Sequence, residues 1–277
     1  MRLIPNAVIC LAIALVLPSC GGGGSSTPPT PTPQSLSITP GTTILKVNQT
    51  ETFAGTLAMS NGQTQTVQPT WQSDNTTVLT FDSGGTARGR GNGTATIIGT
   101  HQGLQATRLI RVATDYQGTW LGDYVLRRCE ESGDFQSIDF CDREDGFYVG
   151  QVLEIMLDLQ QDRDEVTGDL ALGGLDGTTR GRVDSNGRYV GTGSTTFTEN
   201  GISVVFAVDP LIVNAEGDRM TGAFTVTVTA VGASGQGVVQ AELKTVARIA
   251  SGVVPLGRHT WPVGSIPDVL RKMRLTR

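Results

Sequence analysis

Few residues of this chain have the chemistry and spacing to act on a substrate, and its thiols are the most informative of them. The 277 residues include four cysteines and two histidines. A thiol can be acylated, form a disulfide, ligate a metal or act as a nucleophile. Neither histidine, His101 or His259, has a partner at the spacing of HExxH or lies near a nucleophile motif. General acid–base catalysis by histidine is therefore not indicated.

Carboxylates are the other candidates for chemistry. Asp162, Asp164 and Glu165 could flank a groove, as the paired carboxylates of glycoside hydrolases do, although charged turns are the ordinary explanation. The acidic residues within and just after segment 129–141 lack the DxDxDG spacing of a calcium loop, which favours a solvated acidic loop. We therefore expect no enzymatic activity, no catalytic residue, no metal and no cofactor. A carbohydrate-active hydrolase is the least favoured alternative.

The N-terminal residues predict export. Arg2 is followed by an apolar run over residues 7–17. This run is shorter than the roughly 20 residues that a membrane-spanning helix needs, and Pro18 ends it. The residues Leu17-Pro18-Ser19-Cys20 then resemble a bacterial lipobox, with Pro18 in a place that a small residue usually holds.

The lipobox resemblance implies a lipid anchor at Cys20. Residues 1–19 would be a lipoprotein signal peptide, and Cys20 would carry a diacylglyceryl group on its sulfur and an acyl chain on its amino group. Gly21, rather than Asp, follows the cysteine, which implies the outer membrane in Gram-negative lipoproteins. We therefore expect a bacterial cell-envelope protein that is held to a membrane by its lipid. An ordinary cleaved signal peptide, with Cys20 incidental, is the alternative.

The two remaining cysteines predict a disulfide. Cys10 leaves with the signal peptide and Cys20 is the lipid site, so Cys129 and Cys141 are left as a pair in an oxidising compartment. Closing a loop of this size stabilises the fold by roughly 3 kcal/mol through the unfolded state. Two free thiols are the alternative. A metal site is disfavoured because no CxxC and no neighbouring His completes a ligand set.

Composition divides the rest of the chain into four segments. Residues 20–34 are rich in Gly, Ser, Thr and Pro and form a tether without a core. The 36 glycines, the 17% charged residues and the short alternating runs of Val, Thr and Ile predict all-β domains at 35–114 and 115–250. Residues 251–277 are a basic tail, in which Ser265-Ile266-Pro267-Asp268 predicts the start of one short helix.

The first of these domains shares motifs with a known family. They are Ser37-Ile38-Thr39-Pro40, Val47 with Gln49-Thr50, Trp71-Gln72-Ser73-Asp74-Asn75 with Val78, and Gly93-Thr94-Ala95-Thr96-Ile97. With these motifs, residues 35–113 resemble the bacterial Ig-like domain, group 2, found as repeats in surface proteins such as the invasin and intimin adhesins. The resemblance implies a small β-sandwich used for spacing, adhesion or carbohydrate contact, and a single copy favours a spacer. Trp71 lies on an alternating strand where it can fill the space between two sheets.

The second domain shows eight strand candidates joined by short turns. One begins at Gly118, and seven lie near 151–160, 165–172, 178–183, 188–197, 202–212, 219–229 and 237–247. Short turns permit antiparallel neighbours, and eight strands can close into a barrel. Gly118-Thr119-Trp120 resembles the entrance strand of lipocalin-like barrels, in which Trp closes one end. Trp120 and Tyr124 are then candidates for lining a ligand cavity. A two-sheet sandwich is the competing architecture.

Charge is unevenly distributed and limits the partners. Residues 1–114 carry a net charge of +3, residues 115–250 carry −12 and residues 251–277 carry +4. The acidic middle disfavours nucleic acid as a partner. The basic tail has three possible roles: docking on the acidic domain, attraction to a membrane, or a partly disordered terminus.

These patterns predict a lipid-anchored envelope protein with a structural or adhesive role, in which the second domain contacts surface polysaccharide or an envelope protein. The alternative is a small-molecule binding module with an apolar cavity beside Trp120. A cavity of about 300 Å³ or more inside the barrel favours that alternative, and a core filled by side chains contradicts it.

Overall fold

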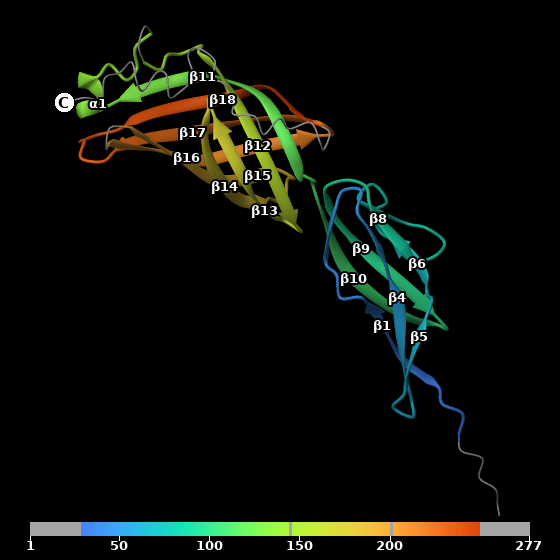
Figure 1. Cartoon of the computed structure of the whole chain (residues 1–277). Helices are drawn as coiled ribbons and strands as arrows, with labels where there is room; N and C mark the ends of the chain where they lie inside the picture. The colour runs from blue at the N-terminus through green and yellow to red at the C-terminus, as the bar shows by residue number, and fades with distance from the viewer. Residues whose placement is uncertain (1–28, 144–145, 200–201, 250–277) are drawn as a thin grey trace, which may run out of the picture.

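The computed structural model describes residues 29–143, 146–199 and 202–249. Within them, strands β1 to β10 form a sandwich and strands β11 to β18 form a closed barrel, which confirms the predicted all-β fold class. Figure 1 shows the two arranged end to end, with the described chain entering the sandwich at the end that is remote from the barrel. No helix in the described ranges is both long and apolar enough to cross a bilayer.

The sandwich consists of three small sheets. Their strand orders are β1-β4-β5, β2-β10-β9-β6 and β3-β8-β7. All the pairs are antiparallel except β2 with β10. The bounds are β1 Pro33–Thr39, β2 Ile44–Lys46, β3 Thr50–Thr52, β4 Ala54–Met59, β5 Thr64–Val67, β6 Thr70–Ser73, β7 Leu79–Phe81, β8 Thr86–Gly89, β9 Gly93–His101 and β10 Leu104–Ala113.

The chain passes from one sheet of the sandwich to another at Phe53. The alternating pattern from Thr50 to Met59 is typical of a single strand, but the chain breaks at Phe53 into β3 and β4, which belong to different sheets. Phe53 is fully buried, and its N–H donates to the carbonyl of Gly85 at 3.0 Å. The side chain is therefore held in the core at the point where the chain passes from one sheet to the other.

Trp71 packs against this core, as its position in the sequence predicts. Its ring stacks on Phe81, with centroids 5.3 Å apart and planes 10° apart, and lies 6.2 Å from the ring of Phe53. On the neighbouring strand, Gly99 lies directly opposite in register. A Cβ on Gly99 would lie 2.9 Å from the indole, so the absence of a side chain there makes room for the ring.

The barrel closes in sequence order from β11 to β18, and β18 pairs with β11. The two-sheet sandwich considered for this domain is therefore wrong. The bounds are β11 Gly118–Glu131, β12 Val152–Asp162, β13 Glu165–Leu172, β14 Leu175–Val183, β15 Tyr189–Glu199, β16 Ile202–Glu216, β17 Arg219–Ala230 and β18 Gly237–Arg248, and a short helix α1, Asp134–Ser137, lies between β11 and β12.

Alternation along most of the strands separates the barrel interior from its outer wall. On β12, Leu153, Ile155, Leu157 and Leu159 are buried while the residues between them lie on the outer wall. The same pattern repeats on β13, β14 and β17. The buried side chains join into one apolar core that continues from the linker before β11 to the loop before β12. The ends of the barrel are thus closed by residues from its connections.

Candidate functional site

Several residues singled out in the sequence lie outside the described residues. They are Cys20, His259 and the basic tail 251–277. Lipid attachment at Cys20 and a helix in the tail therefore stay predictions. His101, the other histidine, ends β9 opposite Leu104 in the β9–β10 hairpin.

Tyr116 closes the end of the barrel that faces the sandwich. Its hydroxyl lies 2.9 Å from the carbonyl oxygens of both Gly187 and Val213, either of which can accept its proton. The same oxygen accepts the N–H of Tyr189 at 3.0 Å and of Ala215 at 3.3 Å. One hydroxyl therefore connects the start of β15 to the end of β16.

Burial determines the ionisation of this phenol. Desolvation raises the pKa of Tyr116 to about 12, and the hydrogen bonds from the backbone N–H groups of Tyr189 and Ala215 only partly oppose the rise. The backbone N–H of Tyr116 donates to Oε1 of Gln161 at 2.7 Å. The ring is therefore a neutral structural plug at physiological pH.

Trp120 contacts Tyr116 and is fully buried. Its indole N–H donates to the carbonyl of Tyr116 at 2.8 Å, and the guanidinium of Arg248 lies 4.6 Å from the centre of its ring. Arg248 is itself held by the backbone carbonyl of Asp115 at 2.6 Å and by its carboxylate at 3.2 Å. Trp120 is therefore part of the packed end of the barrel, beside Tyr116.

The second cavity candidate, Tyr124, faces the interior near the opposite end. It packs edge-on against Phe224, with ring centres 5.1 Å apart, and burial raises the pKa of its hydroxyl. The cavity beside it measures about 20 Å³. It is lined by Tyr124, Leu126, Phe147, Leu153, Leu172, Phe206, Val226, Val228 and Val239.

This cavity is too small for an ordinary ligand. Its volume has room for about one water molecule, whereas small-molecule sites measure about 300 to 1,000 Å³. Side chains fill the described barrel interior. The large apolar cavity that the small-molecule alternative requires is therefore missing from the described part of the barrel. Trp120 and Tyr124 belong to the packed core.

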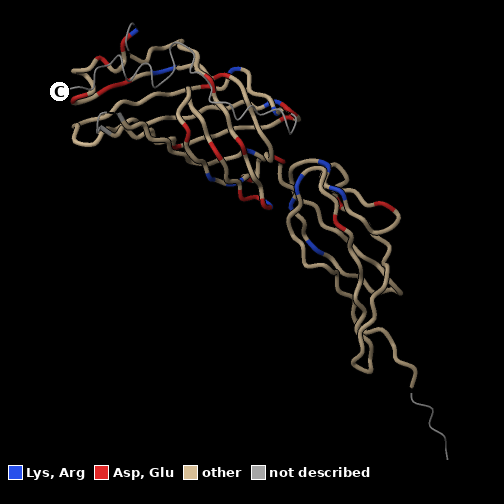
Figure 2. The backbone as a smooth tube through the Cα atoms, viewed as in Figure 1, with Lys and Arg blue, Asp and Glu red and all other residues tan. Residues whose placement is uncertain are grey.

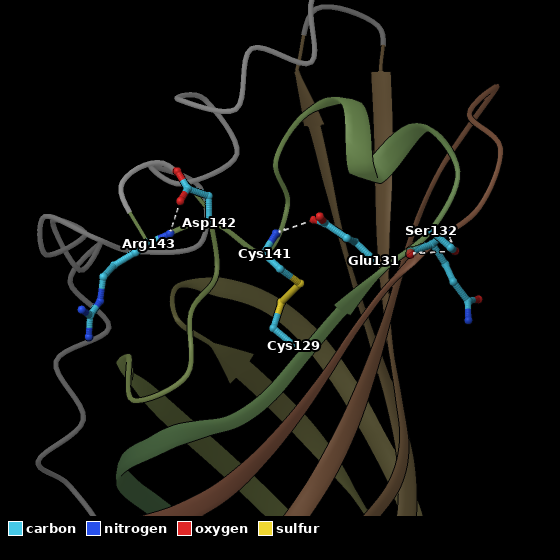
Figure 3. The surroundings of a disulfide bond; sticks show 7 residues. Cys129, Glu131, Ser132, Cys141, Asp142 and Arg143 are labelled. Carbon is cyan, nitrogen blue, oxygen red and sulfur yellow. Dashed lines mark hydrogen bonds between the residues drawn. A yellow bond between two sulfur atoms is a disulfide. The ribbon is translucent and has the colours of Figure 1, made fainter.

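The predicted disulfide is formed at the far end of the barrel. The sulfur atoms of Cys129, at the end of β11, and Cys141 are 2.06 Å apart. Figure 3 shows Glu131 directed towards Cys141, whose N–H donates to its carboxylate at 2.7 Å. The disulfide and this hydrogen bond attach the loop after β11 to the strand that it leaves.

Three aromatic rings from this loop close the far end. Phe135 and Phe140 meet edge-on with centres 5.4 Å apart, and Phe147 lies 5.0 Å from Phe140. All three are buried in the barrel core. Asp134 accepts the N–H of Ser234 at 2.7 Å, which joins the loop to the β17–β18 turn. Within the described residues, no group of three His, Cys, Asp or Glu side chains could hold a metal ion.

The carboxylates considered for hydrolysis have structural partners. Asp164 forms an ion pair with Arg111 at 3.1 Å, and Glu165 forms one with Arg182 across the hairpin. Asp162 is exposed at the end of β12. Two carboxyl groups that converge on a cleft, which glycoside hydrolysis requires, are therefore missing at this turn.

Arg111 also forms the centre of a joint between the two folds. Its guanidinium donates to the carbonyl oxygens of Val183 and, at 2.8 Å, Asp184. Three barrel groups thus accept hydrogen bonds from one cation at the end of β10. Partial burial raises the pKa of Asp184, but hydrogen bonds from Arg188 and Asn186 outweigh this and lower it, so the turn keeps its negative charge.

Two further sandwich residues complete the joint. Lys46 donates to the side chain of Gln117 at 2.6 Å and lies 3.8 Å from the carboxylate of Asp115. Asn92 donates to the carbonyl of Ser185 at 3.2 Å. Sequence reasoning did not identify these contacts. The sequence did hold one signal for these contacts, because the first domain has a positive net charge and the second is acidic. Figure 2 shows Lys and Arg residues at the end of the sandwich that faces the barrel.

Comparison with known proteins identifies the first domain. Residues 33–110 match the family model described as "Bacterial Ig-like domain (group 2)", which confirms the predicted resemblance. No curated protein matches the chain.

Two solved structures of one surface-layer protein are similar to the chain at a low level. Domains 5–6 of the S-layer protein SbsC show 16% identity and a TM-score of 0.28, with 76% of this chain and 98% of that chain covered. Domains 4–9 of SbsC show the same identity, TM-score and cover of this chain, which here spans 31% of the length of that chain.

Proposed function

We propose that this chain, in which residues 33–110 form a bacterial Ig-like domain of group 2, is a cell-envelope lipoprotein with a structural or adhesive role and no enzymatic activity. In this proposal Cys20 carries the lipid and residues 20–34 are the tether. The Ig-like domain is a spacer that holds the barrel away from the membrane. The outer membrane is the expected address, from Gly21 after the lipid site.

The joint is the observation that carries the proposal. Arg111, Lys46 and Asn92 each contact the barrel or the linker, so the sandwich and barrel are connected by side chains as well as by one segment of chain. The tether enters at the end of the sandwich that is remote from this joint (Figure 1). Such an arm displays its far end at a fixed distance from the point where the tether enters the sandwich.

The far end of the barrel is the part that the arm would display. It carries the disulfide loop and three exposed aliphatic side chains: Val149 (59% exposed) in the loop before β12, Val152 (44%) at the start of β12 and Val231 (75%) just after β17. Exposed aliphatic groups at one end of a domain favour contact with another macromolecule. An envelope protein or a surface polysaccharide is the proposed partner.

Metabolic labelling tests the anchor. Cells that express the wild-type chain or the Cys20→Ala variant are given a palmitate analogue with a clickable tag. Incorporation into the wild type and its loss in the variant are the expected result, with protein level measured by immunoblot as the control. Unlabelled wild-type protein in the cytoplasm, with residues 1–19 retained, would contradict the proposal.

Binding measurements test the role. The mature chain is applied to a glycan array and to isolated envelope proteins, with Val149→Asp and Val231→Asp variants as probes of the far end. Val190→Asp is the matched control because Val190 is also exposed but lies at the opposite end of the barrel, next to the β14–β15 turn. If all three variants bind equally well, the far end of the barrel is not the binding surface, and this part of the proposal is wrong.

A further inference from the structure

The outer wall of the barrel over β11, β12 and β13 has an apolar row with acidic rows on both sides. Leu121, Met156 and Ala171 lie side by side in register on these three strands, and all are half-buried on the outer face. This row is half-buried apolar surface on the solvent side of the wall, where antiparallel strands more often carry polar residues.

Carboxylates flank this row. Asp123 and Glu154 lie opposite each other on one side of it, and Asp158 and Asp169 lie opposite each other on the other. We call these four carboxylates and the apolar row the wall patch. Like charges directly opposite across strands are destabilising. None of the four forms an ion pair with a Lys or Arg of the described residues, and Figure 2 shows the acidic positions on neighbouring strands.

The described chain ends next to this patch. The N–H of Ile249 donates to the carbonyl of Thr119 at 2.9 Å. Thr119 lies opposite Asp158, and its hydroxyl donates to that carboxylate at 3.0 Å. The tail that follows therefore starts at the border of the wall patch. Fifteen residues, 250–264, separate Ile249 from Ser265. An extended chain spans about 3.3 Å per residue and neighbouring strands are about 4.8 Å apart, so this segment is long enough to bring residues 265–277 to the patch.

The tail has the composition that complements the wall patch. Residues 265–277 contain the basic residues Arg271, Lys272, Arg274 and Arg277 and the apolar residues Val269, Leu270, Met273 and Leu275. We propose that residues 265–277 dock on the wall patch, with apolar side chains on the row of Leu121 and Met156 and cations on the flanking carboxylates. The barrel then has a covered wall, and the basic residues of the tail are not available to an anionic membrane.

Zero-length cross-linking tests this docking in the full mature chain. Carbodiimide joins an amine to a carboxylate that it contacts, and the chain has only three lysines, Lys46, Lys244 and Lys272. We expect a cross-link from Lys272 to Glu154, Asp158 or Asp169, which decreases as salt rises because exposed pairs are screened. The Lys46 pair with Asp115, 3.8 Å apart, is the internal positive control. Lys272→Arg keeps the charge and removes the reactive amine.

Two results of this experiment overturn the proposal. One is Lys272 cross-linked to carboxylates on the opposite wall, such as Asp209 or Glu216, as often as to the wall patch. The other is cross-links that join light and heavy chains in a mixture of normal and ¹⁵N-labelled protein, which would place the tail on a second copy.

Hydrogen exchange gives an independent measurement. The triple variant Glu154→Gln, Asp158→Asn, Asp169→Asn should speed deuterium uptake by residues 265–277 about five- to tenfold, since each exposed pair contributes a few tenths to one kcal/mol. Asp209→Asn with Glu216→Gln is the matched control and should leave uptake unchanged. Equal deuterium uptake in the wild type, the triple variant and the control would reject docking. If the wild-type protein then also binds vesicles of phosphatidylglycerol and phosphatidylethanolamine through its tail, the tail is a membrane-binding segment.

Discussion

The guanidinium of Arg111, in the last strand of the sandwich, lies 3.1 Å from the carboxylate of Asp164, in the first hairpin turn of the barrel. About a fifth of each side chain is exposed, so the pair is better shielded from solvent than an ordinary surface ion pair. The same guanidinium donates to two backbone carbonyls of the β14–β15 turn. Two turns of the barrel are thus held by one residue of the sandwich, and this contact limits how the two folds move relative to each other.

Replacing Arg111 with Ala should loosen the joint. We expect a broader distance distribution between spin labels at Gln65→Cys in the sandwich and Thr196→Cys in the barrel, measured by pulsed electron paramagnetic resonance on the mature chain with Cys20→Ser. A double-mutant cycle with Asp164→Ala should give a coupling of about 1 kcal/mol in urea unfolding. Arg88→Ala, which removes an exposed hydrogen bond within the sandwich, is the control. An unchanged distribution in Arg111→Ala would show that the linker alone sets the geometry.

Sequence patterning predicts the barrel because the local signals agree. Most strands of the barrel alternate in polarity, and the turns contain glycine where the backbone needs it, as at Gly187 with a φ of +82° in the β14–β15 turn. Closure follows once eight antiparallel strands have short connections. The break at Phe53 was not predicted, because a residue that passes between sheets keeps the same alternating pattern on both sides.

Contacts between distant segments are what the sequence does not reveal. The role of Tyr116 depends on Val213 and Gly187 reaching its hydroxyl, and the role of Arg111 depends on two turns of another domain. Neither has a local motif. The disulfide was predictable because only two cysteines were left after the signal peptide and the lipid site. The closure of the barrel by three phenylalanines was not, because they lie in an irregular loop.

Removing the hydroxyl of Tyr116 should destabilise the barrel. In Tyr116→Phe, the backbone N–H groups of Tyr189 and Ala215 lose their acceptor inside the barrel end. An unsatisfied buried donor costs about 1–3 kcal/mol, so we expect a loss of this size at pH 8, measured by urea unfolding followed by far-ultraviolet circular dichroism. Tyr148→Phe is the matched control, because the Tyr148 side chain is only half-buried. Equal midpoints for Tyr116→Phe and wild type would refute the plug.

Alkaline pH should weaken the same plug in a defined window. Below pH 10 the phenol of Tyr116 is protonated in the folded and unfolded chains, so it adds no pH dependence. Its folded-state pKa is raised to about 12, so between pH 10 and 12 only the unfolded chain loses the proton. The free energy of unfolding should therefore fall by about 1.4 kcal/mol per pH unit from this group.

The Tyr116→Phe variant isolates that contribution. Burial also raises the pKa values of Tyr124 and Tyr189, so the wild type should lose additional stability in alkali. The difference in stability between wild type and Tyr116→Phe should shrink from pH 8 to pH 12, because only the wild type has this phenol to titrate. Urea midpoints at pH 8, 10, 11 and 12 measure it. A difference that stays constant with pH would contradict the assigned shift.

Removing the disulfide should destabilise the loop that closes the far end. The link spans a sequence separation of 12, and in the chain-entropy model a loop of this size contributes roughly 3 kcal/mol. The double variant Cys129→Ser, Cys141→Ser avoids an unpaired thiol and should lower the urea midpoint accordingly. It should also increase hydrogen exchange first in residues 132–143, because Phe135 and Phe140 are held over the barrel end by this loop. Dithiothreitol should reproduce the effect in the wild type and leave the double variant unchanged. If reduction leaves exchange of the loop unaltered, the three phenylalanines alone hold it in place.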